Sequence, residues 1–233
     1  MCKIAQRQLT NKTAILFFSR TSHEEIKFKD FGFGAANKCI SQLFIQKTLH
    51  TLDQTDLPVV KVFSQNQRGI DFGDRLSNAI EFTFDKGFES VIVVGNDCIG
   101  LSKAKIKNAQ KALLSNDYVV GPDTVGGLYL LGVNKESYQR SLLEKLAWKT
   151  TSLLKSFQKS TQHFAIHTLE ALADINDAQS FKDVVRRFKF IDRFVLLLKS
   201  FIQQKEIIVL KTIENLPKGF YILFQYRGPP CLA

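Results

Sequence analysis

The sequence predicts an α/β fold in which a mostly parallel sheet lies between two layers of helices. Short apolar runs typical of buried strands alternate with helical segments of about 10–15 residues, the order of successive βαβ units with right-handed crossovers. The 233 residues are 45% hydrophobic and 23% charged, an ordinary globular composition. A chain of this length buries enough surface to fold without metal or disulfide cross-links. No internal repeat or low-complexity tract is present.

Six segments have the composition of strands. The first, TAILFF, is a continuous apolar run of the kind found in strands that are buried on both faces. A loop containing glycine separates the fourth segment from the fifth. The predicted strands are Thr13–Phe18, Pro58–Phe63, Ser90–Val94, Tyr118–Val120, Leu128–Val133 and Phe164–Leu169.

Three longer segments are predicted as helices: Phe33–Leu52, Phe72–Lys86 and Lys103–Ser115. In the second of them, apolar and small residues recur at the spacing of one helix face, namely Leu76, Ala79, Ile80, Thr83 and Phe84. Gly87 follows at the position where a glycine commonly ends a helix. We expect ligands beyond the carboxyl ends of the strands, as in other open α/β sheets.

The net charge of +10 and the pI near 9.4 are the unusual features of the composition. Residues 181–233 hold ten Lys or Arg and four Asp or Glu, and they therefore carry +6 of the +10. We interpret residues 1–180 as the α/β domain and residues 181–233 as a basic, amphipathic C-terminal helical extension packed on it. Apolar residues from Val184 to Ile202 recur at helical spacing, which fits packing against the domain, a homodimer, or contact with an anionic membrane surface.

Several classes of function lack their signatures. The four cysteines form no C-x-x-C pair and are expected to be free thiols. No apolar run reaches the roughly 18 residues that span a bilayer, and the first residues lack a signal-peptide core, so we expect a cytoplasmic protein. A phosphate-binding G-x-x-x-x-G-K-[ST] loop and a hydrolase G-x-S-x-G elbow are both missing, and no motif predicts nucleic-acid binding.

Acidic residues after two predicted strands are candidate metal ligands. Asp97 follows the strand Ser90–Val94, and Asp174 follows the late strand. Carboxylates at this edge suit Mg²⁺ or Mn²⁺, which share oxygen ligands with substrate phosphates. The alternative for Asp97 is an N-cap, and for Asp177 we prefer that interpretation.

Two further stretches are candidate ligand sites. Gly73 and Arg75 stand at the start of a predicted helix, where backbone amides and a guanidinium bind anions, although Asp74 and Arg75 could instead simply cap and solvate that helix. Gly126 and Gly127 follow Asp123 between two strands, where glycine allows close approach to a ligand or simply a tight turn.

Taken together, these stretches resemble one family. Their order along the chain is Gln67–Arg75, Gly95–Cys98, Gly121–Gly127, the W-x-T element Trp148–Thr150, and Asp174–Asn176. This order is similar to that of the GT-A-fold transferases labelled selenodomain-associated or glycosyltransferase-like, and more distantly to the nucleotidyltransferases that make phospholactate-guanosine and molybdenum-cofactor dinucleotides. The resemblance spans roughly Thr13 to Val184.

The resemblance implies a three-layer α/β/α sandwich, a nucleotide-sugar or NTP donor, and a divalent cation, Mg²⁺ or Mn²⁺. By position, Asp97 matches the metal-binding aspartate and Asp174 the later acidic ligand. Gly126, Gly127 and Tyr129 match the acceptor loop, and Trp148 matches the tryptophan of the W-x-T element.

The chain departs from the family pattern at several positions. Arg20–Glu25 replaces a basic phosphate loop, Val125 stands where an acid precedes the double glycine, and Lys149 replaces a serine. We therefore hold two hypotheses. The first is a metal-dependent glycosyl- or nucleotidyltransferase in which Asp97 and Asp123 act at the reacting centre and Arg20 and Arg75 offset phosphate charge. The second is a weakened relative that binds a nucleotide or a protein partner without turnover.

Overall fold

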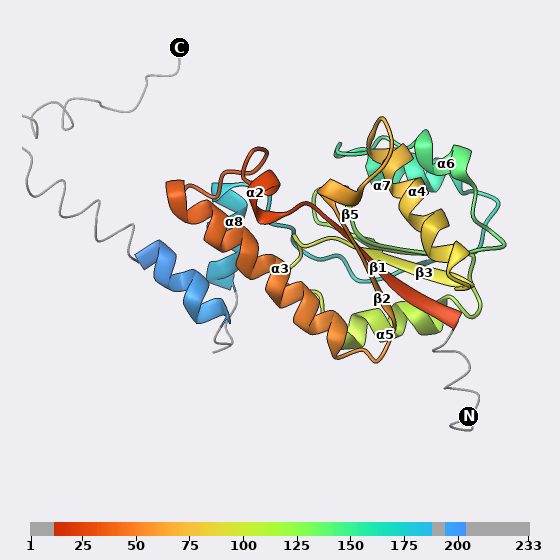
Figure 1. Ribbon diagram of the computed structural model, residues 1–233, viewed down its shortest axis with the longest axis horizontal. Coiled ribbons are helices and arrows are strands. Elements are labelled where there is room, and N and C mark those ends of the chain that lie inside the picture. The colour runs from red at the N-terminus through yellow and green to blue at the C-terminus, as the bar shows by residue number, and fades with distance from the viewer. Residues whose placement is uncertain (1–11, 188–193, 204–233) are drawn as a thin grey trace, which may run out of the picture. The chain divides into compact units, whose positions relative to one another are not determined.

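The computed structural model describes residues 12–187 and 194–203 (Figure 1). The chain divides into two compact units, residues 1–184 and 185–233. The sheet and the helices that cover it belong to the first unit. In the second unit, residues 194–203 are helical. No helix in the described ranges combines the length and the apolar composition that a membrane crossing requires.

The strands of the first unit form one six-stranded sheet in the order β2-β1-β3-β5-β4-β6. Five of them run in the same direction, and β5 is antiparallel to both of its neighbours, β3 and β4. The sheet is therefore mostly parallel, as predicted. The strands are β1 (Thr13–Ser19), β2 (Val59–Phe63), β3 (Ser90–Val94), β4 (Tyr118–Pro122), β5 (Leu128–Asn134) and β6 (Ile166–Thr168).

Helices cover both faces of this sheet (Figure 1). On one face, α3 (Asn37–Asp53) and α5 (Lys103–Ala112) pack their apolar side chains on the sheet. On the other face, α4 (Phe72–Asp85), α6 (Arg140–Glu144) and α7 (Leu153–Ser160) do the same. The three-layer α/β/α sandwich is thus confirmed, and its core consists of the two apolar interfaces, which are sufficient to stabilise a domain of this size.

The predicted elements agree with the structure except at their ends. The helix expected from Phe33 begins only at Asn37, after a 3₁₀ turn at Gly34–Ala36, because Gly34 adopts a left-handed φ of 54°. The strand expected at Phe164–Leu169 is shorter, because only Ile166–Thr168 pairs with β4. The short helices α2 (Ser22–Glu25), α6 and α7 were not predicted, since none is long enough to show a helical period.

The C-terminal part of the sequence is described in two pieces. Helix α8 (Ala178–Arg187) begins at Asp177, whose side chain accepts a hydrogen bond of 2.7 Å from the Ser180 amide, so the predicted N-cap is confirmed. Residues 194–203 are helical as well. The remainder of the predicted basic extension, residues 188–193 and 204–233, lies outside the described residues.

One edge of the sheet collects the loops that carry the candidate residues. Strands β1, β2, β3, β4 and β6 all end there because they are parallel, and β5 begins there. The residues that follow β1, β3 and β4 include Arg20, Asp97 and Asp123. An open α/β sheet places its ligands at this edge.

Candidate functional site

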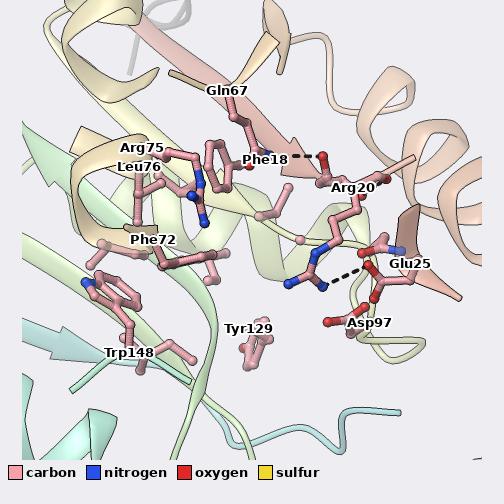
Figure 2. Close-up of a pocket in the computed structure, with 18 residues that line it drawn as sticks. Phe18, Arg20, Glu25, Gln67, Phe72, Arg75, Leu76, Asp97, Tyr129 and Trp148 are labelled. Carbon is pink, nitrogen blue, oxygen red and sulfur yellow. Dashed lines mark hydrogen bonds and ion pairs between the residues drawn. The ribbon is translucent and has the colours of Figure 1, made fainter. Parts of the chain in front are cut away.

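A cavity of about 180 Å³ opens at this carboxyl edge of the sheet (Figure 2). Its wall comes from the ends of β1 and β3, the start of β5, the first turn of α4 and the segment before α7. Figure 2 shows the guanidinium groups of Arg20 and Arg75 reaching into the same space, with Trp148 and Phe72 on one side and Asp97 and Glu25 on the other. The cavity therefore has an acidic side, where Arg20 is paired with Glu25, and a cationic side at Arg75.

The acidic side is organised around the ammonium group of Lys29. Its Nζ lies 2.6 Å from Asp97 Oδ2 and 3.3 Å from Glu25 Oε1, and it donates a hydrogen bond of 3.2 Å to the Ile175 carbonyl. Burial opposes the charge of Lys29, yet the neighbouring carboxylates of Asp97 and Glu25 outweigh it and raise the lysine pKa. Lys29 thus remains a cation and neutralises the acids around it.

Asp174 is the second carboxylate on this side. The Ile175 amide donates a hydrogen bond of 3.1 Å to the Asp97 carbonyl, which holds the Asp174 segment against the end of β3. Asp174 Oδ1 is buried and has no hydrogen-bond partner among the described residues. Burial, and then the charge of Asp97, raises the pKa of Asp174 to about 7. A buried carboxylate in this state gains from any added cation or hydrogen-bond donor.

The pair Asp97 and Asp174 offers oxygen ligands of the kind that Mg²⁺ and Mn²⁺ prefer. Among the described residues, no group of three or more His, Cys, Asp or Glu side chains is arranged to hold a metal by itself. The unpartnered oxygen of Asp174 beside Asp97 nevertheless fits a cation that takes its remaining ligands from a phosphate and from water.

The cationic side begins at the start of α4. Asp71 caps this helix by accepting a hydrogen bond of 2.9 Å from the Asp74 amide, and Asp74 in turn accepts one of 2.8 Å from the Ile70 amide. Arg75 follows in the same turn and lines the cavity, and its guanidinium donates a hydrogen bond of 3.3 Å to the Ile70 carbonyl. Arg20 lies 3.1 Å from Glu25 and stacks over Phe28.

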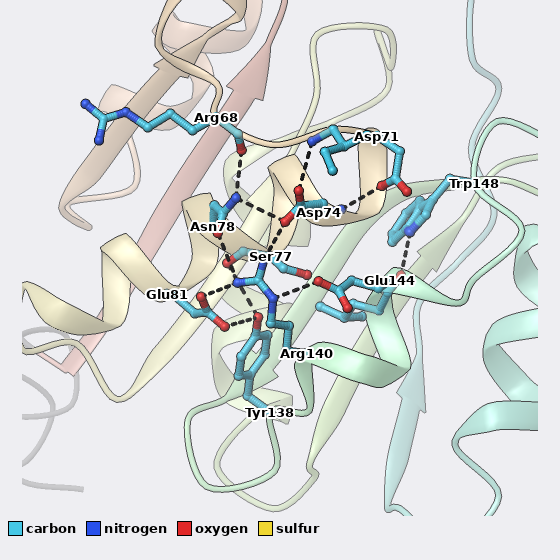
Figure 3. A network of polar contacts seen from close by, with 12 residues as sticks. Arg68, Asp71, Asp74, Ser77, Asn78, Glu81, Tyr138, Arg140, Glu144 and Trp148 are labelled. Atoms are coloured by element: carbon cyan, nitrogen blue, oxygen red, sulfur yellow. Dashed lines mark hydrogen bonds and ion pairs between the residues drawn. The ribbon is translucent and has the colours of Figure 1, made fainter.

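A salt-bridge network behind the cavity fixes α4 against α6 (Figure 3). The guanidinium of Arg140 binds Asp74 and lies 2.5 Å from Glu81 on α4 and 2.7 Å from Glu144 on α6. Tyr138 adds a hydrogen bond of 3.0 Å to Glu81. Because Asp74 is also part of the turn that begins α4, the network sets the position of Arg75 at the cavity.

Aromatic rings close the cavity on the α4 side. The rings of Phe72 and Trp148 lie 5.0 Å apart, and the Trp148 indole donates a hydrogen bond of 2.7 Å to the Leu143 carbonyl. A Cβ at Gly73 would lie 3.0 Å from the indole nitrogen, so glycine makes room for Trp148. Tyr129 lines the opposite wall and donates a hydrogen bond of 3.1 Å to the Glu170 carbonyl.

The double-glycine loop after β4 lies beside this cavity and is not part of its lining. Asp123 Oδ1 accepts hydrogen bonds from the Val125 and Gly127 amides, at 2.8 and 2.7 Å. Gly126 has a left-handed φ of 99°, and a Cβ there would meet the Thr151 carbonyl oxygen at 2.1 Å. Both glycines are therefore needed for the loop to close on itself and on the next segment.

The structure brings most of the predicted site residues together. Five of them line the cavity: Arg20, Arg75, Asp97, Tyr129 and Trp148. Asp174 interacts electrostatically with Asp97 and Asp123, Gly73 supports Trp148, and Asp123, Gly126 and Gly127 form the adjoining loop. Glu25 and Lys29 were not chosen as site residues from the sequence, although their i,i+4 spacing after the first strand was an available signal.

Comparison with known proteins agrees with this architecture. A candidate nucleotide-diphospho-sugar transferase from Desulfovibrio desulfuricans G20 superimposes with a TM-score of 0.74 at 18% identity, over 83% of this chain and 98% of that one. A 4-diphosphocytidyl-2C-methyl-D-erythritol synthase from Anaerococcus prevotii DSM 20548 gives a TM-score of 0.47 at 8% identity, over 83% and 97%. At 18% identity, the likeness to the first of these structures shows the fold alone.

No curated protein matches the chain. Residues 33–150, just over half of the sequence, match a protein family described as uncharacterized protein conserved in bacteria (DUF2064). The matched range includes the start of α4, the end of β3, the double-glycine loop and the W-x-T element. The chain is a member of the DUF2064 family and has the nucleotide-diphospho-sugar transferase fold.

Proposed function

We propose that this protein is a nucleotide-dependent transferase, of the glycosyl or nucleotidyl type, that requires Mg²⁺ or Mn²⁺. The observation that carries the proposal is one cavity, at the carboxyl edge of the sheet, lined by the carboxylate of Asp97, which interacts with Asp174, and by the guanidinium groups of Arg20 and Arg75. The phosphates of a nucleotide need both kinds of group, because they bind cationic side chains and bridge to a metal that carboxylates hold.

Asp97 and Asp174 would hold the divalent cation, which neutralises phosphate charge and stabilises the leaving group when bound. Lys29 keeps the two carboxylates in place through its contacts with Asp97 and with the Ile175 carbonyl. Arg75, from the start of α4, and Arg20, from the side of Glu25, would bind the phosphate oxygens. With the metal and the two arginines in these roles, catalysis would come from positioning and from electrostatic stabilisation of the leaving phosphate.

The acceptor would approach from the double-glycine loop. Asp123 lies in that loop, close enough to Asp174 to raise its pKa, and the loop is fixed by two hydrogen bonds to the Asp123 carboxylate. An acceptor hydroxyl that binds there faces the donor phosphates held in the cavity. Tyr129 and Trp148 shape the walls between the two positions.

A second candidate is a nucleotide-binding protein without turnover. The observation that favours it is the ion pair between Lys29 and Asp97, 2.6 Å long, because it occupies an oxygen that a metal would need. The exposed Val125 in the acceptor loop, where the related families have an acid, points the same way.

A thermal-shift panel of nucleoside triphosphates and nucleotide-sugars, each with Mn²⁺ and with EDTA, tests the proposal. We expect stabilisation by at least one nucleotide that depends on Mn²⁺ and disappears in Asp97→Ala. The exposed Asp53→Ala variant, on α3, serves as the matched control and should behave like wild type. Absence of a response to every nucleotide, with and without Mn²⁺, would refute the proposal. Binding without product release in a radiolabel assay would instead establish the second candidate.

A further inference from the structure

Lys149, in the W-x-T element, carries a cation next to the cavity. Its backbone adopts a left-handed φ of 61°, and in the described part of the chain only one other non-glycine residue, Asp56, has a positive φ. Its Nζ lies 5.6 Å from the centre of the Phe72 ring, which lines the cavity. A lysine seldom adopts this conformation, because it costs backbone energy.

Lys149 and Arg75, on the α4 side of the cavity, have no carboxylate partner among the described residues. Within residues 12–187 and 194–203, neither Lys149 nor Arg75 forms an ion pair with a carboxylate. Burial, and then the nearby charges of Arg20 and Arg75, lowers the pKa of Lys149. The three cations are thus close enough to repel one another, and a polyanion between them removes that repulsion.

The arrangement bears on the choice of donor. A nucleoside triphosphate carries about two more negative charges than a nucleotide-sugar, because its terminal phosphate is a monoester. Arg20 is already paired with Glu25, and Lys29 with Asp97 and Glu25, so their charges are largely compensated. The uncompensated charges of Arg75 and Lys149 match those of the extra phosphate.

We propose that Arg75 and Lys149 bind the terminal phosphates of a nucleoside triphosphate, and that this donor, not a nucleotide-sugar, is the substrate of the cavity. The inference rests on the proposed function and selects one of its two reaction types. In the transfer, an acceptor oxygen forms a bond to the α-phosphorus, the bond between the α-phosphorus and its bridging oxygen breaks, and pyrophosphate leaves with the electron pair. The proton of the acceptor hydroxyl passes to solvent.

Equilibrium binding measured by calorimetry, in Mg²⁺, tests the proposal. The ligands are the four common ribonucleoside triphosphates, the nucleoside diphosphate glucoses with the same bases, and inorganic tripolyphosphate as a probe without a base. The best triphosphate should bind wild type about tenfold more tightly than its nucleotide-sugar. Lys149→Asn should weaken the triphosphate and tripolyphosphate about tenfold and change the nucleotide-sugar by less than about twofold.

Two further variants separate charge from backbone conformation. Lys149→Arg keeps a cation at the same place and should retain triphosphate affinity. Asp56→Asn introduces an asparagine at the other non-glycine position with a left-handed φ, which precedes β2 and so lies at the amino edge of the sheet, away from the cavity. This variant should bind the triphosphate like wild type. Because asparagine tolerates a left-handed φ, neither asparagine variant should lower the melting temperature.

A nucleotide-sugar that binds as tightly as the triphosphate, or an equal loss for both ligands in Lys149→Asn, would overturn this inference and leave the proposed transferase standing. Failure of every nucleotide to bind would overturn the proposed function itself. The two results are therefore distinct.

Discussion

The buried carboxyl group of Asp174 makes the stability of this protein depend on pH in a defined direction. Its pKa is raised from an ordinary value near 3.8 to about 7, mainly by burial and then by Asp97. A raised carboxyl pKa means that the folded state holds a proton that the unfolded state releases, so stability falls as pH rises from about 4 to 7. Replacing the group with an amide, in Asp174→Asn, removes this penalty.

The size of the effect follows from the same pKa. The difference between the folded and unfolded values corresponds to about 4 kcal/mol once the group is fully ionised. Asp174 as a whole is only partly buried, so water screens part of this, and we expect about 2–3 kcal/mol. Asp174→Asn should therefore unfold with a free energy about 2–3 kcal/mol higher than wild type at pH 8.5, and less than about 1 kcal/mol higher at pH 4.

Urea denaturation followed by far-ultraviolet circular dichroism, in EDTA, measures the difference at both pH values. Asp177→Asn is the matched control. The Ser180 amide and hydroxyl lower the pKa of that exposed carboxylate, so its charge adds stability at high pH. The control variant should be slightly less stable than wild type at pH 8.5, and the gap should close as pH falls through the lowered pKa. An Asp174→Asn variant that is equally or less stable than wild type at pH 8.5 would refute the reasoning.

Three other outcomes follow from contacts around the site. Gly126→Ala should destabilise the fold by more than about 2 kcal/mol in urea denaturation, because its Cβ would overlap the Thr151 carbonyl. The control, Gly87→Ala, has a similar φ of 91° but lies in open space and should cost about 1 kcal/mol. Equal costs for the two variants would contradict this reasoning. Arg140→Gln should lower the melting temperature, because it removes the cation that binds Asp74, Glu81 and Glu144. The decrease should be larger at low salt than at high salt. An unchanged melting temperature would show that the network does not stabilise the fold. Lys149→Asn should raise the free energy of unfolding by about 1 kcal/mol as backbone strain is relieved, while Lys149→Arg should leave it unchanged.

The order of strands and helices was predictable because it depends on local periodicity. The alternation of TAILFF and SVIVV with longer amphipathic segments identifies β1, β3 and the helices between them. The direction of β5 was not predictable in the same way, since an apolar run has the same composition in a parallel or an antiparallel strand. Short helices such as α6 span too few residues to show a period.

The site was predictable only in part. Asp97 and Arg75 follow directly from their places after a strand and at a helix start. Lys29 meets Asp97 from a position 68 residues earlier in the chain, and nothing in either local sequence indicates that contact. Lys149 was visible as a departure from the W-x-T pattern, but its direction depends on a left-handed backbone that composition does not indicate. Side-chain contacts between loops depend on the path of the chain, which periodicity leaves open.

The intrinsic fluorescence of Trp148 tests the central claim most directly, because this residue is the only tryptophan in the sequence and it lines the cavity. Titration with a nucleoside triphosphate in Mn²⁺ should change the emission saturably, and the change should be lost in EDTA and in Asp97→Asn. A nucleotide that binds by calorimetry without changing the Trp148 emission, or with the same affinity in Asp97→Asn, would contradict the assignment of this cavity as the nucleotide site.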